Sequence, residues 1–348
     1  MRRSLLEILV DPVERTPLTL NATATGPDDT VLEGTLTSTT GATYEITDGI
    51  PRFVPADEQQ QTATSFGYKW KRQETYEFDH YVDLIRNDEV PRWGFDNVEQ
   101  FYDMFRNRKR ILDAGCGSAH FASIYVPHAL TTGEWVGTDL STAIHIAQQR
   151  LGQRPGTNFV RANLLELPYK DASFDMVFCR GVMHHTPSTY RAFKSLSRVV
   201  ESGGEFAFLI YRKMGPIREF TDAYIRDEVI SKLTPDEGWE ALAPLTKLGK
   251  ALAELKLEVD VPEDIPYLGI PKGKHDIHRL VYYYFLKAYW NPDLSFDTNQ
   301  HNTFDWYHPP YSSHHTAEEI QAWAKEAGFK VTFMKEMETS WAVRTVRL

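Results

Sequence analysis

The chain has 348 residues, 42% of them hydrophobic, with a formal net charge of −10 and a pI near 5.7. This length can bury one large core or two domains, and the acidic balance without a Lys/Arg-rich run argues against a nucleic-acid partner. No apolar run reaches membrane-spanning length. The cysteines, Cys116 and Cys179, are expected to be reduced and inert. We therefore expect a soluble, cytoplasmic protein that binds a small or neutral molecule, with no membrane partner and no nucleic acid.

Residues 1–56 are predicted to form a small β module. Alternating stretches at 16–20 and 43–46 are separated by turn-forming residues, and Asp48-Gly49-Ile50-Pro51 closes the module. Together with Leu5-Leu6-Glu7-Ile8-Leu9 and Asp11-Pro12, this pattern resembles the Trm112-like zinc-ribbon module.

In that family, pairs of cysteines bind zinc. Here Asp11 and Glu14 stand where the first pair belongs, and residues 36–44 contain no cysteine. Zinc needs nitrogen or sulfur ligands at fixed spacing, so we predict no metal. The module is then expected to serve homodimerisation or docking, with a purely structural appendage as the alternative.

Residues 57–108 are predicted to be a polar linker followed by a ligand-covering helical segment. The stretch 65–72 is aromatic at every second position up to Trp70. The rings of Tyr68 and Trp70 in this stretch are expected either to contact a ligand or to pack on the core. Helical patterns follow near 79–86 and 95–107.

The stretch from Arg110 to Phe121 is predicted to be a strand that ends in an acid, turns at two glycines and opens a helix. Gly115 and Gly117 allow unusual backbone dihedrals and close approach of a ligand. A dinucleotide fingerprint would place a third glycine where this chain has His120. An NAD site is therefore disfavoured.

Strands and helices then alternate, which is typical of a parallel sheet. The second predicted strand, 134–139, ends at Asp139, and Ser141 is expected to cap the next helix. A carboxylate at this spacing from the glycines can accept both hydroxyl groups of a ribose. The third strand leads to Asn163, whose side-chain oxygen is a hydrogen-bond acceptor.

The fourth and fifth strands complete the pattern. Residues 173–186 read Ser-Phe-Asp-Met-Val-Phe-Cys-Arg-Gly-Val-Met-His-His-Thr, and Gly203-Gly204 turn into the fifth strand. With the glycine motif, this run resembles the class I S-adenosylmethionine (SAM) methyltransferases, which implies a Rossmann-like, SAM-binding core over 109–212 that belongs to a seven-stranded α/β sheet. The resemblance implies a set of cofactor-binding residues: Tyr68, Trp70, Asp113, Gly115, Cys116, Gly117, Asp139, Leu140, Asn163, Leu164 and Arg180.

Residues 213–315 are too long for a plain loop. Helical patterns near 216–233, 236–257 and 275–290, the last rich in tyrosine, predict a helical, aromatic lid that binds the acceptor, with an oligomer interface as the alternative. Residues 316–348 are predicted to add a helix, opened by a capping box of Thr316 and Glu319, and a β-hairpin that completes the sheet.

A methyl acceptor that must lose a proton needs a base. The candidates are His185, Tyr211 and His314, with His184 and His315 beside them. We predict methyl transfer from SAM to a small molecule, such as a natural-product intermediate, an amino acid or a sugar. Two alternatives stay open: intramolecular cyclisation of SAM to azetidine-2-carboxylate and 5′-methylthioadenosine, and a non-catalytic SAM-binding partner subunit.

Overall fold

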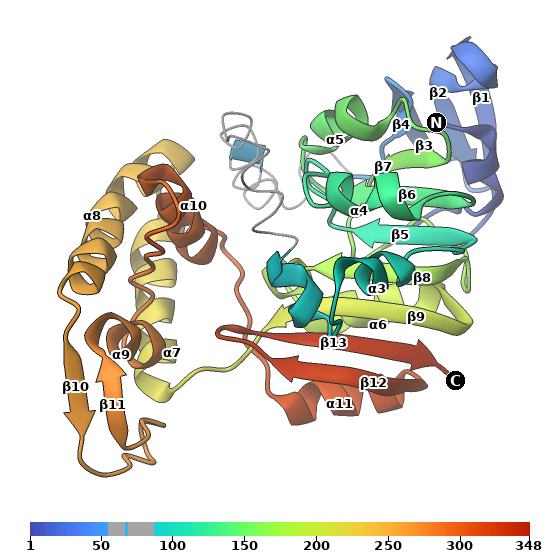
Figure 1. Cartoon of the computed structure of the whole chain (residues 1–348). Coiled ribbons are helices and arrows are strands. Elements are labelled where there is room, and N and C mark those ends of the chain that lie inside the picture. The colour runs from blue at the N-terminus through green and yellow to red at the C-terminus, as the bar shows by residue number, and fades with distance from the viewer. Residues whose placement is uncertain (55–66, 69–86) are drawn as a thin grey trace. The chain divides into compact units, whose positions relative to one another are not determined.

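The computed structural model describes residues 1–54, 67–68 and 87–348 (Figure 1). The helix predicted near 79–86 lies outside these residues, as does Trp70. The chain divides into two compact units, one formed by Met1–Tyr211 with His315–Leu348 and the other by Arg212–His314. In the described parts of the chain, every helix is too short or too polar to cross a bilayer.

The first unit is built on a seven-stranded sheet, which confirms the predicted class I methyltransferase fold. Its strand order is β12-β13-β9-β8-β5-β6-β7. All neighbours from β9 to β7 pair in parallel, whereas β13 runs antiparallel to β9 and to β12. The strands are β5 (Arg110–Ala114), β6 (Glu134–Asp139), β7 (Thr157–Arg161), β8 (Phe174–Arg180), β9 (Val200–Tyr211), β12 (Phe329–Glu336) and β13 (Ser340–Arg347).

Helices cover both faces of this sheet. Neighbouring residues on a strand point to opposite faces, so each strand contributes side chains to two cores. Leu112 belongs to a core that also contains residues of α6 (Thr189–Val199) and α11 (Ala317–Glu326). Ile111 belongs to the other core, with residues of α3 (Val98–Asp103), α4 (Ala122–Ala129) and α5 (Ile144–Leu151). The predicted capping box opens α11, with Thr316 and Glu319 bonding each other's backbone N–H.

The N-terminal module is a four-stranded antiparallel sheet, opened by the 3-10 helix η1 (Arg3–Glu7). A second 3-10 turn, η2 (Pro27–Asp29), separates its first two strands. The strands are β1 (Leu18–Thr25), β2 (Val31–Ser38), β3 (Thr43–Thr47) and β4 (Ile50–Pro51).

The module packs on the edge strand of the large sheet. Arg52 forms a parallel bridge with Arg161 of β7, and the Phe53 N–H donates to the Arg161 carbonyl at 2.8 Å. Leu5 and Leu36 are fully buried in the same core as Leu112. The module therefore covers an edge whose backbone groups would otherwise be exposed to pairing by another chain.

Asp11 organises the loop where the zinc-ribbon resemblance places cysteine. Its carboxylate accepts hydrogen bonds from the backbone N–H groups of Val13 and Glu14 at 2.9 and 2.8 Å and from the Tyr44 hydroxyl at 2.9 Å. Burial alone would raise the pKa of Asp11. The hydrogen bonds lower it by more than burial raises it, so the pKa lies below its usual value. A hydrogen-bonded carboxylate thus joins the loop to β3.

The second unit is mainly helical and contains a small hairpin. Its elements are α7 (Pro216–Tyr224), the π-helical turn η5 (Ile225–Val229), the 3-10 turn η6 (Ile230–Lys232), α8 (Pro235–Glu254), β10 (Glu258–Val261), β11 (Gly273–Asp276), α9 (Ile277–Tyr284) and α10 (Phe296–Tyr307). The predicted helices at 216–233 and 236–257 correspond closely to α7 through η6 and to α8. The predicted third helix was too long, since α9 ends at Tyr284 rather than near 290.

The early end of α9 has a specific cause in the core of this unit. The Lys287 N–H donates to the Asp222 carboxylate at 3.2 Å and to the Tyr307 hydroxyl at 3.1 Å, so it takes no part in a helical ladder. Asp222 also pairs with Arg218 and accepts from Trp306 Nε1 at 2.8 Å. A buried carboxylate therefore holds α7, α10 and the segment after α9 together.

Candidate functional site

The glycine turn follows β5 and has the backbone that its sequence predicts. Gly115 and Gly117 have φ of +80° and +55°, and the Gly115 N–H donates to the Thr138 carbonyl at 2.7 Å. A Cβ at Gly115 would lie 2.4 Å from the Val182 side chain. The predicted helix begins later than expected, at Ala122, because Ala119 also has positive φ, +54°.

Replacing Gly115 with alanine is expected to weaken cofactor binding by about 30- to 300-fold. Positive φ is unfavourable for a residue with a Cβ, and the contact with Val182 adds overpacking, for a total of about 2–3.5 kcal/mol. Calorimetric titration with S-adenosylhomocysteine measures this loss. Gly203→Ala is the matched control, because Gly203 has φ of +77° and, among the residues that the structure describes, no atom lies within 4 Å of an added Cβ. Equal losses in both variants would contradict the prediction.

Asp139 closes the turn from the neighbouring strand. Its Oδ2 accepts from the Gly117 N–H at 2.8 Å, and its Oδ1 accepts from the Ser141 N–H at 2.8 Å and from the Ser141 hydroxyl at 2.6 Å. Burial raises the pKa of Asp139. Ser141 is not the N-cap residue that the sequence predicts, because α5 starts at Ile144 after Ala143. The Ser141 hydroxyl donates to Asp139 and accepts the Ala143 N–H at 3.3 Å.

Replacing Asp139 with alanine is expected to weaken cofactor binding by about 1–3 kcal/mol, through loss of a buried polar pairing. The test compares dissociation constants of S-adenosylhomocysteine for the wild type and the variant. Asp171, an exposed acid that pairs with Arg15 and Arg198, offers a control variant, Asp171→Ala. Unchanged affinity in Asp139→Ala would refute the assignment of Asp139 to the ribose.

Asp113 ends β5 and lies at the head of a buried hydrogen-bond chain. The Tyr125 hydroxyl donates to Asp113 Oδ2 at 2.8 Å, and Trp135 Nε1 donates to the Tyr125 hydroxyl at 3.0 Å. Burial, together with the charge of Asp139, raises the pKa of Asp113 to about 7. A nearby cation would favour its ionised form. Tyr125 and Trp135 were not among the predicted site residues.

The third strand-end residue is Asn163. Its Oδ1 accepts from the Leu165 N–H at 3.0 Å, a turn that fixes the side chain and leaves the oxygen able to accept a second bond. Leu164 is buried beside it. The Leu140 carbonyl accepts from Arg161 Nε at 3.0 Å. These residues follow β6 and β7, so they extend the site beyond Asp139.

Arg180 ends β8, on the other side of β5. Its Nε and Nη2 donate to Glu89 Oε1 at 3.0 and 2.7 Å, and its guanidinium lies 4.7 Å above the Phe121 ring. Glu89 was missed in the sequence. No local pattern could have revealed it, because its partner is 91 residues away.

Of the remaining predicted cofactor residues, Cys116 is buried and its N–H donates to the Thr138 carbonyl at 3.1 Å. Burial raises the pKa of its thiol well above the usual value, so the thiol is a packing group. Tyr68 is half-buried, and a Cβ on its neighbour Gly67 would lie 3.2 Å from Thr142 Oγ1. This places residues 67–68 beside Thr142, which follows Asp139.

His184, His185 and Tyr211 form an aromatic cluster. The His184 ring stacks on Tyr211 with centroids 3.6 Å apart, and His185 meets both rings edge-on at 4.4 and 5.3 Å. His184 Nδ1 accepts the Tyr211 backbone N–H at 3.2 Å. Two of the predicted catalytic residues, His185 and Tyr211, are therefore in contact.

The third predicted catalytic residue, His314, belongs to the second unit. Its Nδ1 lies 2.8 Å from Glu219 Oε2, and its ring lies 5.3 Å from that of Trp306. The hydrogen bond from His314 holds the pKa of Glu219 below its usual value, although burial by itself would raise it. Its neighbour His315 belongs to the first unit and donates its N–H to the Tyr211 carbonyl at 3.0 Å.

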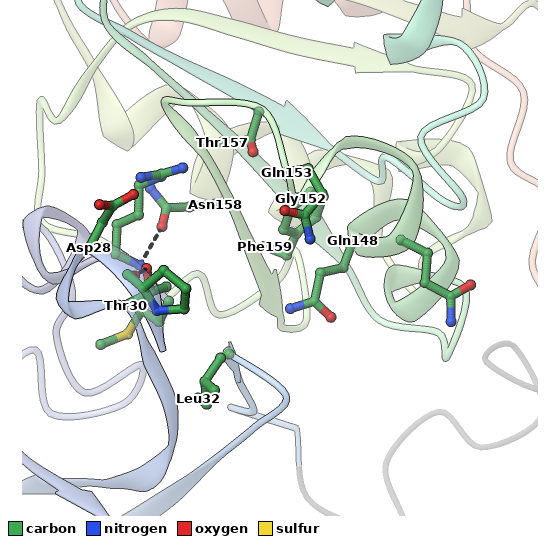
Figure 2. A pocket seen from close by; sticks show the side chains of 14 residues that line it. Asp28, Thr30, Leu32, Gln148, Gly152, Gln153, Thr157, Asn158 and Phe159 are labelled. Carbon is green, nitrogen blue, oxygen red and sulfur yellow. Dashed lines mark hydrogen bonds between the residues drawn. The ribbon is translucent and has the colours of Figure 1, made fainter. Parts of the chain in front are cut away.

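A cavity of about 380 Å³ lies between the N-terminal module and the large sheet. Figure 2 shows Thr30 and Leu32 on the side of the module, with Gln148 of α5 and Phe159 of β7 facing them. Its lining includes the first residues of β7, whereas open α/β sheets bind ligands at the carboxyl ends of their strands. This cavity is therefore separate from the glycine turn.

The residues of the turn fit SAM better than a dinucleotide. Two buried carboxyl groups, Asp113 and Asp139, stand at adjacent strand ends, where a pyrophosphate would disfavour their ionised forms and a cation would favour them. A ligand with an ammonium group and two hydroxyl groups matches these acceptors. The turn from Ala114 to Ala119 contains neither lysine nor arginine.

Comparison with known proteins agrees with this fit. Residues 112–208 match the family model described as a methyltransferase domain. The chain is similar to phthiotriol/phenolphthiotriol dimycocerosates methyltransferase 1 of Mycobacterium ulcerans (strain Agy99), with 33% identity over 153 residues, which cover 42% of this chain and 54% of that protein.

It is also similar to malonyl-acyl-carrier protein O-methyltransferase of Legionella pneumophila subsp. pneumophila (strain Philadelphia 1), with 33% identity over 112 residues, or 31% of this chain and 37% of that protein. The chain spans about half the length of the curated relatives it matches.

Among solved structures, an S-adenosylmethionine dependent methyltransferase from Mesorhizobium loti aligns with a TM-score of 0.42 and 17% identity, covering 70% of this chain and 93% of that chain. Residues 112–208 therefore match a methyltransferase domain and lie within a sheet that has the class I topology, and the cofactor that this match implies is S-adenosylmethionine.

Proposed function

We propose that this protein transfers the methyl group of SAM to a small-molecule acceptor in biosynthesis, such as a natural-product intermediate, an amino acid or a sugar. The observation that carries the proposal is the pair of strand-end carboxylates around the glycine turn, with Asp139 bound to the Gly117 N–H. The two relatives above are named for different acceptors, so they support methyl transfer without selecting one.

Bound SAM supplies an electrophilic methyl group on a sulfonium. In our assignment Asp139 accepts the ribose hydroxyls, Asp113 pairs with the ammonium and Asn163 binds the adenine edge. Holding the acceptor in line with the methyl group contributes on the order of 7–11 kcal/mol at best. Aromatic rings and carbonyls near the sulfonium stabilise its charge.

A base is needed only for acceptors that must lose a proton in the reaction. We propose His185 for this role, with Tyr211 lining the acceptor side. His184 is less suited, because its Nδ1 accepts the Tyr211 N–H and a proton there would break that bond. The stacked His184 ring instead fixes Tyr211.

Replacing His185 with glutamine is expected to lower kcat by about 100-fold, the lower end of the effect of a general base, with KM for SAM unchanged. Steady-state kinetics with an identified acceptor measure both constants across pH 5–9. His128→Gln is a control at an exposed histidine that stacks on Tyr102. A parallel fall in cofactor affinity in His185→Gln would assign His185 a structural role.

We propose that residues 213–315 bind the acceptor and that His314, held by Glu219, is a second candidate base. In the unit Arg212–His314, however, Tyr282, Trp306 and Tyr307 are buried. These rings, which the sequence assigns to a closing lid, are occupied in the core of their own unit. Their burial therefore weakens the support that the aromatic sequence of this unit gives to SAM cyclisation.

One experiment separates the proposed function from its alternatives. The purified full chain is incubated with SAM alone, and the nucleosides are analysed by mass spectrometry. Methylthioadenosine above the spontaneous background would refute the proposed methyl transfer in favour of SAM cyclisation. Intact SAM, followed by S-adenosylhomocysteine formation in a screen of amino acids, sugars and hydroxylated small molecules, is the expected result. Binding without turnover of any acceptor would favour a non-catalytic partner subunit.

We also propose a role in homodimerisation for the N-terminal module, whose outer strand β1 is paired only on its β2 side within the module's own sheet. Light scattering of the full chain, with and without Asn21→Pro in β1, tests this. A dimer that dissociates in the variant is expected. A wild-type monomer would refute the proposal.

A further inference from the structure

Glu89 is a buried carboxylate next to the proposed cofactor site. Its side chain is fully buried and accepts hydrogen bonds from Trp93 Nε1 at 2.8 Å and from Arg180 Nε and Nη2 at 3.0 and 2.7 Å. Arg92 pairs with it at 3.2 Å and pairs in turn with the exposed Asp88. The carboxylate therefore connects the segment before the sheet to the end of β8.

This arrangement keeps Glu89 ionised. Burial raises the pKa of a carboxylate, but the charges of Arg180 and Arg92 and the hydrogen bonds from Arg180 and Trp93 lower the pKa of Glu89 below its usual value. Desolvating an ion pair is costly, so the pair is a poor means of stabilising a fold. A function for the pair would account for a fully buried Glu89 carboxylate beside an Arg180 side chain that is 32% exposed.

Arg180 is fixed on two sides by this arrangement. Glu89 accepts hydrogen bonds from Arg180 Nε and Nη2. The ring of Phe121, which follows the glycine turn, lies 4.7 Å from the Arg180 guanidinium. The Phe121 ring stacks on Phe178 of β8 at 5.7 Å, and Trp93 contacts Phe178 at 5.2 Å. The guanidinium is therefore held in one orientation by packed aromatic rings and a carboxylate.

The position of Arg180 on the sheet indicates which part of the cofactor it meets. In the sheet, β5 lies between β6 and β8 (Figure 1). Asp139, assigned to the ribose, ends β6 on one side of the glycine turn, and Arg180 ends β8 on the other. The charge of Arg180 also lowers the pKa of Asp113 and that of His120. The guanidinium is therefore close enough to the end of β5 to influence charged groups there. This is the side opposite the ribose, where the amino-acid part of SAM would lie.

We propose that Glu89 is a positioning residue that orients Arg180 to bind the α-carboxylate of the cofactor. The inference rests on the proposed function as a SAM-dependent enzyme. A guanidinium has several N–H donors in a planar fork, so engaging Nε and Nη2 is compatible with binding a second carboxylate. With Asp113 on the ammonium, the two ends of the amino acid would each meet an opposite charge.

The test compares binding of three nucleosides by calorimetry in the full chain: S-adenosylhomocysteine, its decarboxylated analogue and 5′-methylthioadenosine. Glu89→Gln is expected to lower the affinity for S-adenosylhomocysteine by about tenfold or more, with the other two affinities unchanged. Arg180→Met should produce the same pattern. In a double-mutant cycle, Glu89→Gln should cause no further loss in the Arg180→Met background. Glu99→Gln, which removes charge from a surface pair with Arg106, is the matched control.

Two results would overturn the inference. A parallel loss for all three nucleosides would mean that Glu89 only supports the fold, and unchanged binding of all three would mean that it does not orient Arg180. Failure of the wild type to bind any of the three would instead refute the proposed cofactor, and this outcome is visible before any variant is made.

Discussion

Replacing Asp222 with alanine is expected to lower the free energy of unfolding of the Arg212–His314 unit by about 3–5 kcal/mol, the cost of removing one partner from a buried ion pair. Arg218 and Asp222 are both buried, and Asp222 also accepts from Trp306 Nε1. The variant would leave the Arg218 guanidinium, which also donates to the Tyr282 carbonyl, without its counter-charge.

Hydrogen exchange of peptides from α7 and α9 in the full chain measures this free energy. Glu228→Ala is the control, because it removes an acid of the same unit from an exposed pair with Lys232, and its exchange should match the wild type. If Asp222→Ala behaves like this control, the carboxylate does not hold the unit together. Exchange in β5 and β6 should be unchanged, since these strands belong to the other unit.

The second large effect concerns Asp113 and pH. Burial raises the pKa of Asp113 to about 7 in the folded protein, from 3.8 in the absence of structure. The folded state thus binds the proton more tightly. The resulting stabilisation is complete below about pH 4, is lost as pH rises to about 7, and amounts to on the order of 4 kcal/mol. Asp113→Asn removes this titration.

Urea unfolding of the wild type and of Asp113→Asn at pH 5 and pH 8 measures the difference. Relative to the variant, the wild type is expected to lose stability between these two values, and the variant should be the more stable protein at pH 8 although it lacks the acid assigned to the cofactor ammonium. A constant difference between the two proteins would show that Asp113 titrates in its ordinary range. Saturating S-adenosylhomocysteine should reduce the pH dependence, because its ammonium favours the ionised form.

Several elements follow from local sequence. The alternation of apolar strands and helices from Ile111 to Tyr211 predicted the parallel sheet, and Thr316 with Glu319 predicted the start of α11. These signals are short-range: periodicity, turn-forming glycines and a cap. They need no knowledge of distant contacts.

Helix α10 could not be predicted from such local signals. Its sequence, Phe-Asp-Thr-Asn-Gln-His-Asn-Thr-Phe-Asp-Trp-Tyr, is rich in residues with low helix propensity, and no helix was predicted there. Packing and hydrogen bonds override this: Asn299 Nδ2 donates to the Asn291 carbonyl at 2.9 Å, and the Phe304 ring lies 5.7 Å from that of Trp239 in α8. The β10–β11 hairpin was missed as well.

The sequence by itself determined the glycine turn, the acids that end β5 and β6, and the fold class, because each depends on residues close together in the chain. Only the tertiary structure decided which distant groups meet. It pairs Glu89 with Arg180, directs the Ser141 hydroxyl proton to Asp139, stacks His184 on Tyr211 and buries Asp222 among three segments. These contacts join residues through space, and burial gives them their energies, so no local pattern could reveal them.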